Sequence, residues 1–273
     1  MTNPFGSPGQ YPQGDQNAYQ QNPYGQPQNQ GYQQGYQQQG YQQFQPQNPY
    51  AFDAMNSMTQ GWRVFKENPM PWIVGALVWG GIGFVIFIIG YIPLIMALVE
   101  SSQTYSDEFP LGAFMIFMMF ALVAVAAWSV GYAVMSKVSV KAVAGSPVTV
   151  GDFFQFQGVG KVIGVAILVQ LVVQVGNFFL VAGIVASFLF YFAIVAAAAR
   201  PNDDIMAAFK ISFEIATKNF VQTLLLMILA SIVMMVGSFV LLIGMVAAFP
   251  VMIIGLTHAF QTATKGPVQN RAQ

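Results

Sequence analysis

The chain has 273 residues, of which 55% are hydrophobic and only 7% are charged, and its formal net charge is zero. A typical soluble domain has about 25% charged residues, so this composition predicts a protein that is solvated largely by lipid. The chain has no cysteine and one histidine, which excludes disulfides, cysteine-ligated metals and haem held by two histidines. We therefore expect no cofactor. The first residues lack the basic and apolar regions of a secretory signal peptide, so the first span is expected to act as the insertion signal.

Residues 1–52 form a low-complexity segment of Gln, Asn, Pro, Tyr and Gly. With almost no aliphatic residues, this segment cannot bury enough apolar surface to offset the entropy of ordering, and we predict a disordered cytoplasmic tail. Two roles stay open for the tail, a solvated spacer or a region that binds partners or self-associates. It contains no Lys or Arg, so no binding to nucleic acid is expected.

An amphipathic stretch follows, from Asp53 to Trp72. Its bulky residues Met55, Met58, Trp62 and Phe65 are three, four and three positions apart, which puts them on one face of a helix. Polar residues occupy the opposite face, and two prolines then end the pattern. We predict an interfacial helix that leads into the first membrane span.

Residues 53–265 are predicted to form an all-α integral membrane domain with six spans, followed by a short cytoplasmic tail at 266–273. A span needs about twenty apolar residues. Residues 162–199 contain no charge and would overshoot the bilayer roughly twofold as one helix, so we expect two spans with a turn near 180–183. The same argument divides residues 220–264 near 242–245. The predicted spans are 72–98, 111–135, 162–180, 183–199, 220–242 and 245–264.

The charges predict the orientation of these spans. In the six-span arrangement the ten Lys and Arg residues all fall on one side of the membrane, which is also the side of both termini. The loop after the first span carries instead Glu100, Asp107 and Glu108. The positive-inside rule then puts both termini in the cytoplasm. We therefore predict a multi-pass protein of the plasma membrane, with the lipid bilayer as its first partner.

The amphipathic stretch has an internal counterpart. Residues 53–68 correspond to residues 204–219, with an acidic residue at the start, the same apolar spacing, and Asn at the end. A shorter third copy is expected at 151–161, so that one amphipathic helix and one hairpin form a unit used three times. Anchoring at the membrane interface is the favoured role, and sensing of lipids or partners is the alternative. The expected anchors are Trp62, Phe65, Phe209 and Phe213.

The segments GWRVFKEN (61–68) and SFEIATKN (212–219) each lead into a hydrophobic hairpin. This pattern in a six-span protein resembles the YciC-like bacterial membrane proteins and the membrane domain attached to some glycerophosphodiester phosphodiesterases. The N-terminal tail looks like those of envelope proteins from actinobacteria such as corynebacteria. The resemblance covers roughly residues 53–264 and implies a fold. It does not imply phosphodiesterase activity, because no such domain is present in the sequence.

The predicted spans have no Asp, Glu, Lys or Arg in their interiors, and we expect no enzyme activity. No nucleotide-binding, metalloprotease or Ser-His-Asp motif occurs, and His258 is expected to make an interfacial hydrogen bond. One polar stripe stands out, in which Gln170, Gln174 and Asn177 share a face of the third span. These amides either join neighbouring helices by hydrogen bonds or line a path for a lipid headgroup or small solute.

Two functions therefore stay open. The lack of catalytic groups and the long tail favour a non-enzymatic scaffold or accessory subunit of a membrane or cell-envelope complex, which would bind other membrane proteins or further copies of itself. The repeats and the polar stripe favour a transporter or lipid-handling protein. The second hypothesis requires a cavity that reaches the middle of the bilayer, and a solidly packed centre would argue against it.

Overall fold

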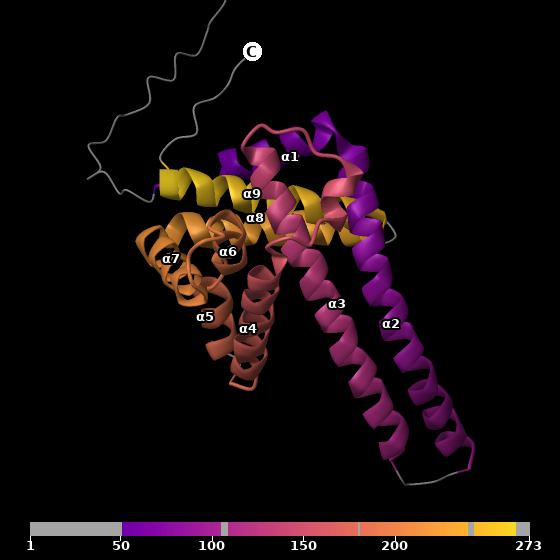
Figure 1. The fold of residues 1–273 in the computed structure, drawn as a ribbon. Helices are drawn as coiled ribbons and strands as arrows, with labels where there is room; N and C mark the ends of the chain where they lie inside the picture. Colours follow the sequence, from indigo (N-terminus) through magenta and orange to yellow (C-terminus); the bar gives the residue numbers. More distant parts are fainter. Residues whose placement is uncertain (1–50, 105–108, 180, 240–242, 266–273) are drawn as a thin grey trace, which may run out of the picture. The chain divides into compact units, whose positions relative to one another are not determined.

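The computed structural model describes residues 51–104, 109–179, 181–239 and 243–265, which form helices joined by turns and loops (Figure 1). Within these residues, six helical segments are long and apolar enough to cross a membrane, so the chain is a polytopic membrane protein of the predicted all-α class. The elements are α1 (Ala54–Glu67), α2 (Pro69–Gln103), α3 (Leu111–Val143), the 3-10 helix η1 (Val150–Phe154), α4 (Val159–Asn177), α5 (Val181–Leu189), α6 (Ala193–Ala199), α7 (Ile205–Lys218), α8 (Phe220–Phe239) and α9 (Ile243–Lys265). The expected tails at 1–52 and 266–273 lie outside the described residues, apart from positions 51 and 52.

The first two spans are longer than predicted. α2 has 35 residues and α3 has 33, against about twenty for one crossing. α2 begins at Pro69, a position where the missing N–H of proline costs nothing, which explains how α1 and α2 meet at Asn68 without a loop. The extra turns at the far end of α2 and at the end of α3 contain Glu, Gln, Ser and Lys. Hydropathy identifies the apolar part of a helix and not its polar ends.

Both long apolar segments are divided, as predicted. α4 ends at Asn177 and α5 begins at Val181, so the first turn falls slightly before the predicted 180–183, and residue 180 lies outside the described part. α9 begins at Ile243, so the second turn falls slightly before its predicted position, and residues 240–242 lie outside the described part. In each of these two helical hairpins, a pair of glycines lets the backbones of the two sides come into contact. An added Cβ on any of these glycines would collide with the opposite side of its hairpin. The pairs are Gly176 with Gly183 and Gly237 with Gly244.

The fourth span contains an interruption that was not predicted. α5 ends at Leu189, residues 190–192 form a turn, and α6 begins at Ala193. The hydroxyl of Ser212, on α7, donates to the carbonyl of Leu189 at 2.8 Å and accepts from the amide of Phe192 at 3.1 Å. One buried side chain therefore satisfies a donor and an acceptor that the interruption releases, which is what an irregular backbone requires inside a membrane protein.

The predicted amphipathic helix is present as α1, and its predicted apolar face is partly buried and partly exposed. Met58 and Phe65 are buried, whereas Met55 and Trp62 are exposed. The centre of the buried face is Gly61, which packs against the backbone of α9. A Cβ at this position would lie 2.5 Å from the carbonyl oxygen of Val251 on α9 and 2.8 Å from the amide nitrogen of Gly255. α1 is therefore docked on a membrane span instead of lying on lipid alone.

Two further contacts fix α1 in this position. The amide of Ala54 donates to Gln222 Oε1 of α8 at 3.0 Å, and Ser57 Oγ lies 3.3 Å from His258 Nδ1 of α9. Phe52, which was assigned to the tail, is also buried and meets Phe192 edge to face at 5.7 Å between ring centres. The packed part of the chain therefore begins before the predicted boundary at residue 53.

The expected third amphipathic helix, at 151–161, is replaced by the five residues of η1. Asp152 and Thr149 form a capping box at its start, and Phe153 is fully buried. The ring of Phe153 meets Trp72 of α2 edge to face at 5.3 Å between ring centres. The third copy thus keeps the acidic cap and a buried aromatic residue, but the segment is too short for an α-helix.

These docking contacts arrange three modules in a cycle. The modules are α1–α3, η1–α6 and α7–α9, and each consists of a short helix followed by a hairpin. α1 packs on the α8–α9 hairpin, η1 packs on α2 and α3, and α7 packs chiefly on α5 and α6 (Figure 1). The short helix of each module therefore docks on the hairpin of another module, and the three modules enclose a common centre.

Candidate functional site

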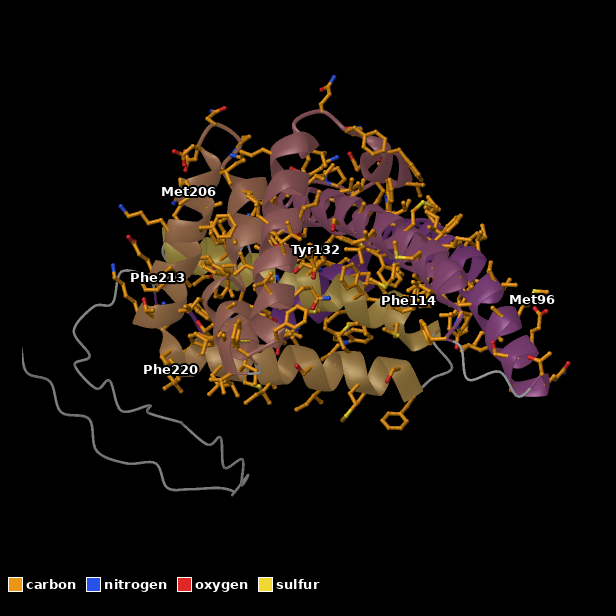
Figure 2. The ribbon with its side chains drawn as sticks, turned by 90° about the horizontal axis from the view of Figure 1, so that it is seen from below. Met96, Phe114, Tyr132, Met206, Phe213 and Phe220 are labelled. Carbon is orange, nitrogen blue, oxygen red and sulfur yellow. The ribbon has the colours of Figure 1, made fainter. Side chains whose placement is uncertain are left out.

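A cleft of about 660 Å³ lies where the three modules meet. It is lined by residues of α2 and α3 from the first module, α4 and α6 from the second, and α8 and α9 from the third. Tyr132, one of the lining residues, lies near the centre of the view in Figure 2. Ligand sites in proteins typically occupy about 300–1,000 Å³. The aromatic residues of the lining are Trp79 and Phe84 on α2, Trp128 and Tyr132 on α3, and Phe249 on α9.

Glycines of α2 have two opposite effects on this region. A Cβ at Gly83 would collide with Trp128 of α3, so this glycine lets the two helices pack closely. Gly80 and Gly81 also line the cleft, but a Cβ at either position would meet no atom within 4 Å. The cleft is therefore open along a part of α2 that has no side chains to fill it.

The predicted polar stripe on α4 is divided between two environments. Gln170 lines the cleft and makes no hydrogen bond within the described residues. The amide of Asn177 donates to Gln174 Oε1 at 2.9 Å, so these two side chains satisfy each other at the end of the helix. The three side chains make no hydrogen bond to another helix within the described part of the chain.

The four predicted interfacial anchors also separate into two pairs. Trp62 and Phe213, which occupy corresponding positions in the repeat, are 49% and 47% exposed. Phe65 is buried beneath the stacked ring of Trp62, at 5.8 Å between ring centres. Phe209 meets Phe190 of the interruption edge to face at 5.1 Å. The first pair offers free aromatic surface, and the second pair holds α1 and α7 in place.

Basic residues gather at one end of the hairpins. The ammonium of Lys161, at the start of α4, donates to the carbonyl oxygens of Arg200 and Asp203 at 2.5 and 2.7 Å. Lys141, near the end of α3, contacts Asp152 at 2.7 Å. Burial acts to raise the pKa of Asp152, but hydrogen bonds from Lys141 and from Thr149 outweigh it and hold that pKa below its usual value.

A second, smaller cleft of about 440 Å³ lies at this end, between α7 and the end of α9. Three of its four charged lining residues are in ion pairs. Arg200 lies 3.7 Å from Asp203, and Glu214 lies 3.9 Å from Lys218. Paired, half-exposed charges offer little to a ligand, so the apolar cleft is the stronger candidate for a functional site.

Within the described residues, no group of three or more His, Asp or Glu side chains is placed to hold a metal ion. Comparison of the chain with protein-family models, curated proteins and solved structures gives no match in any of the three. The resemblance to YciC-like proteins therefore stays a prediction.

The cleft was only partly visible in the sequence. The polar stripe indicated Gln170, but nothing indicated Tyr132 or Trp128. Their spacing, four residues apart on the second span, puts both on one helix face, yet the same spacing is common in ordinary packing between membrane helices. Ser212 was likewise missed, because a serine on an amphipathic helix looks like part of the polar face.

Proposed function

We propose that this polytopic membrane protein binds an apolar molecule from the bilayer in the cleft between its three modules. The observation that carries the proposal is the cleft itself, which is large, apolar and lined by all six long helical segments. Binding sites at the junction of repeated membrane segments are a common feature of transporters. A lipid-handling role therefore has more support than a purely structural one.

The function is one of binding, not catalysis. The cleft lining has no Asp, Glu, Lys, Arg or His among the described residues, so it offers no carboxylate, amine or imidazole as a general acid or base. We also propose that both termini are cytoplasmic. The gathering of Lys141, Lys161 and Arg200 at one end of the hairpins supports this orientation, because basic residues concentrate on the cytoplasmic side.

The test compares two substitutions of the same size. Gly81→Phe would put a ring into the cleft from a position where an added Cβ meets no atom within 4 Å, and Gly112→Phe makes the same change in open space outside the cleft. We expect native mass spectrometry of the purified protein to show bound lipid in the parent protein and in Gly112→Phe, and strongly reduced occupancy in Gly81→Phe.

Equal lipid occupancy in all three proteins would contradict the proposal. If the cleft is empty and the purified protein instead retains another membrane protein in mild detergent, the accessory-subunit hypothesis is favoured. The same preparation therefore distinguishes the two functions.

A further inference from the structure

The lining of the cleft restricts the kind of molecule that fits it. Among the residues that the structure describes, no charged side chain lines the cleft. A charged headgroup would lose its hydration on entry and would find no opposite charge, which is strongly unfavourable in an apolar environment. The part of the occupant that lies inside the cleft is therefore uncharged.

Five lining side chains carry hydrogen-bonding groups, and three of these groups are not available to a ligand. The indole N–H of Trp79 donates to the carbonyl of Phe153 at 3.1 Å. The hydroxyl of Ser129 donates to a carbonyl of its own helix at 2.9 Å. The indole nitrogen of Trp128 packs directly against Gly83.

The other two groups are the hydroxyl of Tyr132 on α3 and the amide of Gln170 on α4. Neither makes a hydrogen bond within the part of the chain that the structure describes, although both residues line the cleft. Polar groups surrounded by lipid and apolar side chains require a partner. A phenol O–H and an amide N–H are both donors, so the pair fits an uncharged molecule that has two acceptor oxygens.

The aromatic residues that line the cleft favour a molecule with a flat ring. Aromatic rings from three helices line the cleft, and the ring of Tyr132 meets Phe249 edge to face at 5.6 Å between ring centres. Such walls favour a planar ring, which gains from aromatic contacts beyond the burial of its area. The flexible chains of an ester lipid carry carbonyl acceptors too, but they would make no particular use of these rings.

We propose that the cleft binds the ring of a lipid-soluble quinone. The two carbonyl oxygens of the ring accept hydrogen bonds from Tyr132 and Gln170, and the hydrocarbon tail extends into the bilayer. This inference rests on the proposed function, since it names the class of molecule that the same cleft takes up.

The test uses decylubiquinone, a quinone with a short tail, and the intrinsic fluorescence of the full-length protein in lipid nanodiscs. Two of the four tryptophans, Trp79 and Trp128, line the cleft, so a bound quinone should quench their emission in a saturable way. We expect Tyr132→Phe and Gln170→Leu each to raise the Kd by about tenfold, which corresponds to one lost hydrogen bond in an apolar site.

The matched controls make the same two substitutions at a tyrosine and a glutamine outside the cleft. Tyr91→Phe and Gln174→Leu remove the same groups from positions outside the cleft, and we expect neither to change the Kd. An unchanged Kd in both cleft variants would overturn the inference. Displacement of the quinone by dioctanoylglycerol at equal concentration would overturn it too, because it would identify an ester lipid as the occupant.

The outcomes for the quinone and for lipid binding in general are separable. If Gly81→Phe removes bound lipid while Tyr132→Phe and Gln170→Leu have no effect on quinone quenching, the cleft binds lipid and the quinone assignment is wrong. If Gly81→Phe changes neither lipid occupancy nor quenching, both proposals are wrong.

Discussion

The helices α1 and α7 are two copies of one design that dock in different ways. Both have 14 residues, both begin after an aspartate whose side chain accepts from a backbone amide at 2.6 Å, and both end at an asparagine. Trp62 and Phe213 correspond to each other and are exposed to nearly the same extent. The common features therefore concern how each helix is started, ended and presented to its surroundings.

The difference lies at one position of the repeat. Gly61 in α1 corresponds to Ser212 in α7. The glycine lets α1 approach the backbone of an uninterrupted span, α9, whereas the serine bonds to the free backbone groups of an interrupted one. The same position of the repeat thus serves docking in both helices. In α1 it has no side chain and allows close backbone contact, and in α7 it provides a hydroxyl for hydrogen bonds.

The two copies also carry opposite charges at the same pair of positions. Arg63 and Glu67 are 3.9 Å apart in α1, and the corresponding Glu214 and Lys218 are 3.9 Å apart in α7 with the signs reversed. Exposed pairs of this kind contribute at most about 1 kcal/mol. What the two copies share here is a pair of opposite charges at the same two positions.

The largest expected effect is at the close contact of α1. Gly61→Leu puts a side chain against backbone atoms of α9 that cannot move aside, and we expect a loss of about 3 kcal/mol or more in stability, at the upper end for overpacking. Thermal unfolding in detergent measures it. Gly112→Leu, the same change in open space, serves as the control, and an equal melting temperature for both variants would contradict the docking of α1 on α9.

A smaller loss is expected from the corresponding position of α7. Ser212→Ala leaves the amide of Phe192 and the carbonyl of Leu189 without their partner, which costs about 1–3 kcal/mol for buried groups. Hydrogen exchange at the Phe192 amide should become faster. Thr217→Ala, whose hydroxyl bonds only within α7, should leave exchange at Phe192 unchanged.

In the module that begins with η1, the carboxylate of Asp152 caps the short helix and pairs with a lysine of α3. The pKa of Asp152 is below its usual 3.8, so the charged carboxylate stabilises the fold fully above that pH, and the contribution is lost as the pH falls through the lowered pKa. We expect the melting temperature of the protein to fall on acidification below about pH 4. Asp152→Asn should melt lower at neutral pH and show less of this acid dependence, whereas Asp203→Asn should keep it.

The smallest effect is expected at the caps, where the two copies are most alike. Asp53→Ala and Asp204→Ala each remove an exposed cap, and we expect losses of about 1 kcal/mol that agree between the two helices. Serine at either position should restore most of the loss. Unfolding measurements that showed one cap to matter much more than the other would contradict the equivalence of the copies.

Local patterns in the sequence predicted the elements of this fold. The six apolar segments, the helices α1 and α7 and the divisions within residues 162–199 and 220–264 follow from composition, length and the spacing of apolar residues. Asp53 and Asp204 also marked the starts of their helices, because a cap acts on residues only three positions away. These features need no knowledge of distant parts of the chain.

The features that were missed depend on distant partners. Bulky side chains defined the expected face of α1, but the centre of its docking surface is Gly61, and its importance comes from a backbone 190 or more residues away. The turn at 190–192 consists of apolar aromatic residues that look like a continuing span, and the serine that supports it lies on another helix. The cleft, likewise, exists only after three modules have come together.

The docking of α1 on α9 sets a condition on biosynthesis. Ser57 and His258, which meet across this contact, are 201 residues apart. At about 5–20 residues per second, α1 leaves the ribosome roughly 10–40 s before its binding surface has been made. During that interval α9 is not there to cover the apolar side of α1. Contact with the membrane surface would remove that side from water. We therefore expect α1 to bind the lipid headgroup region until the last hairpin has been inserted, and then to dock on α9.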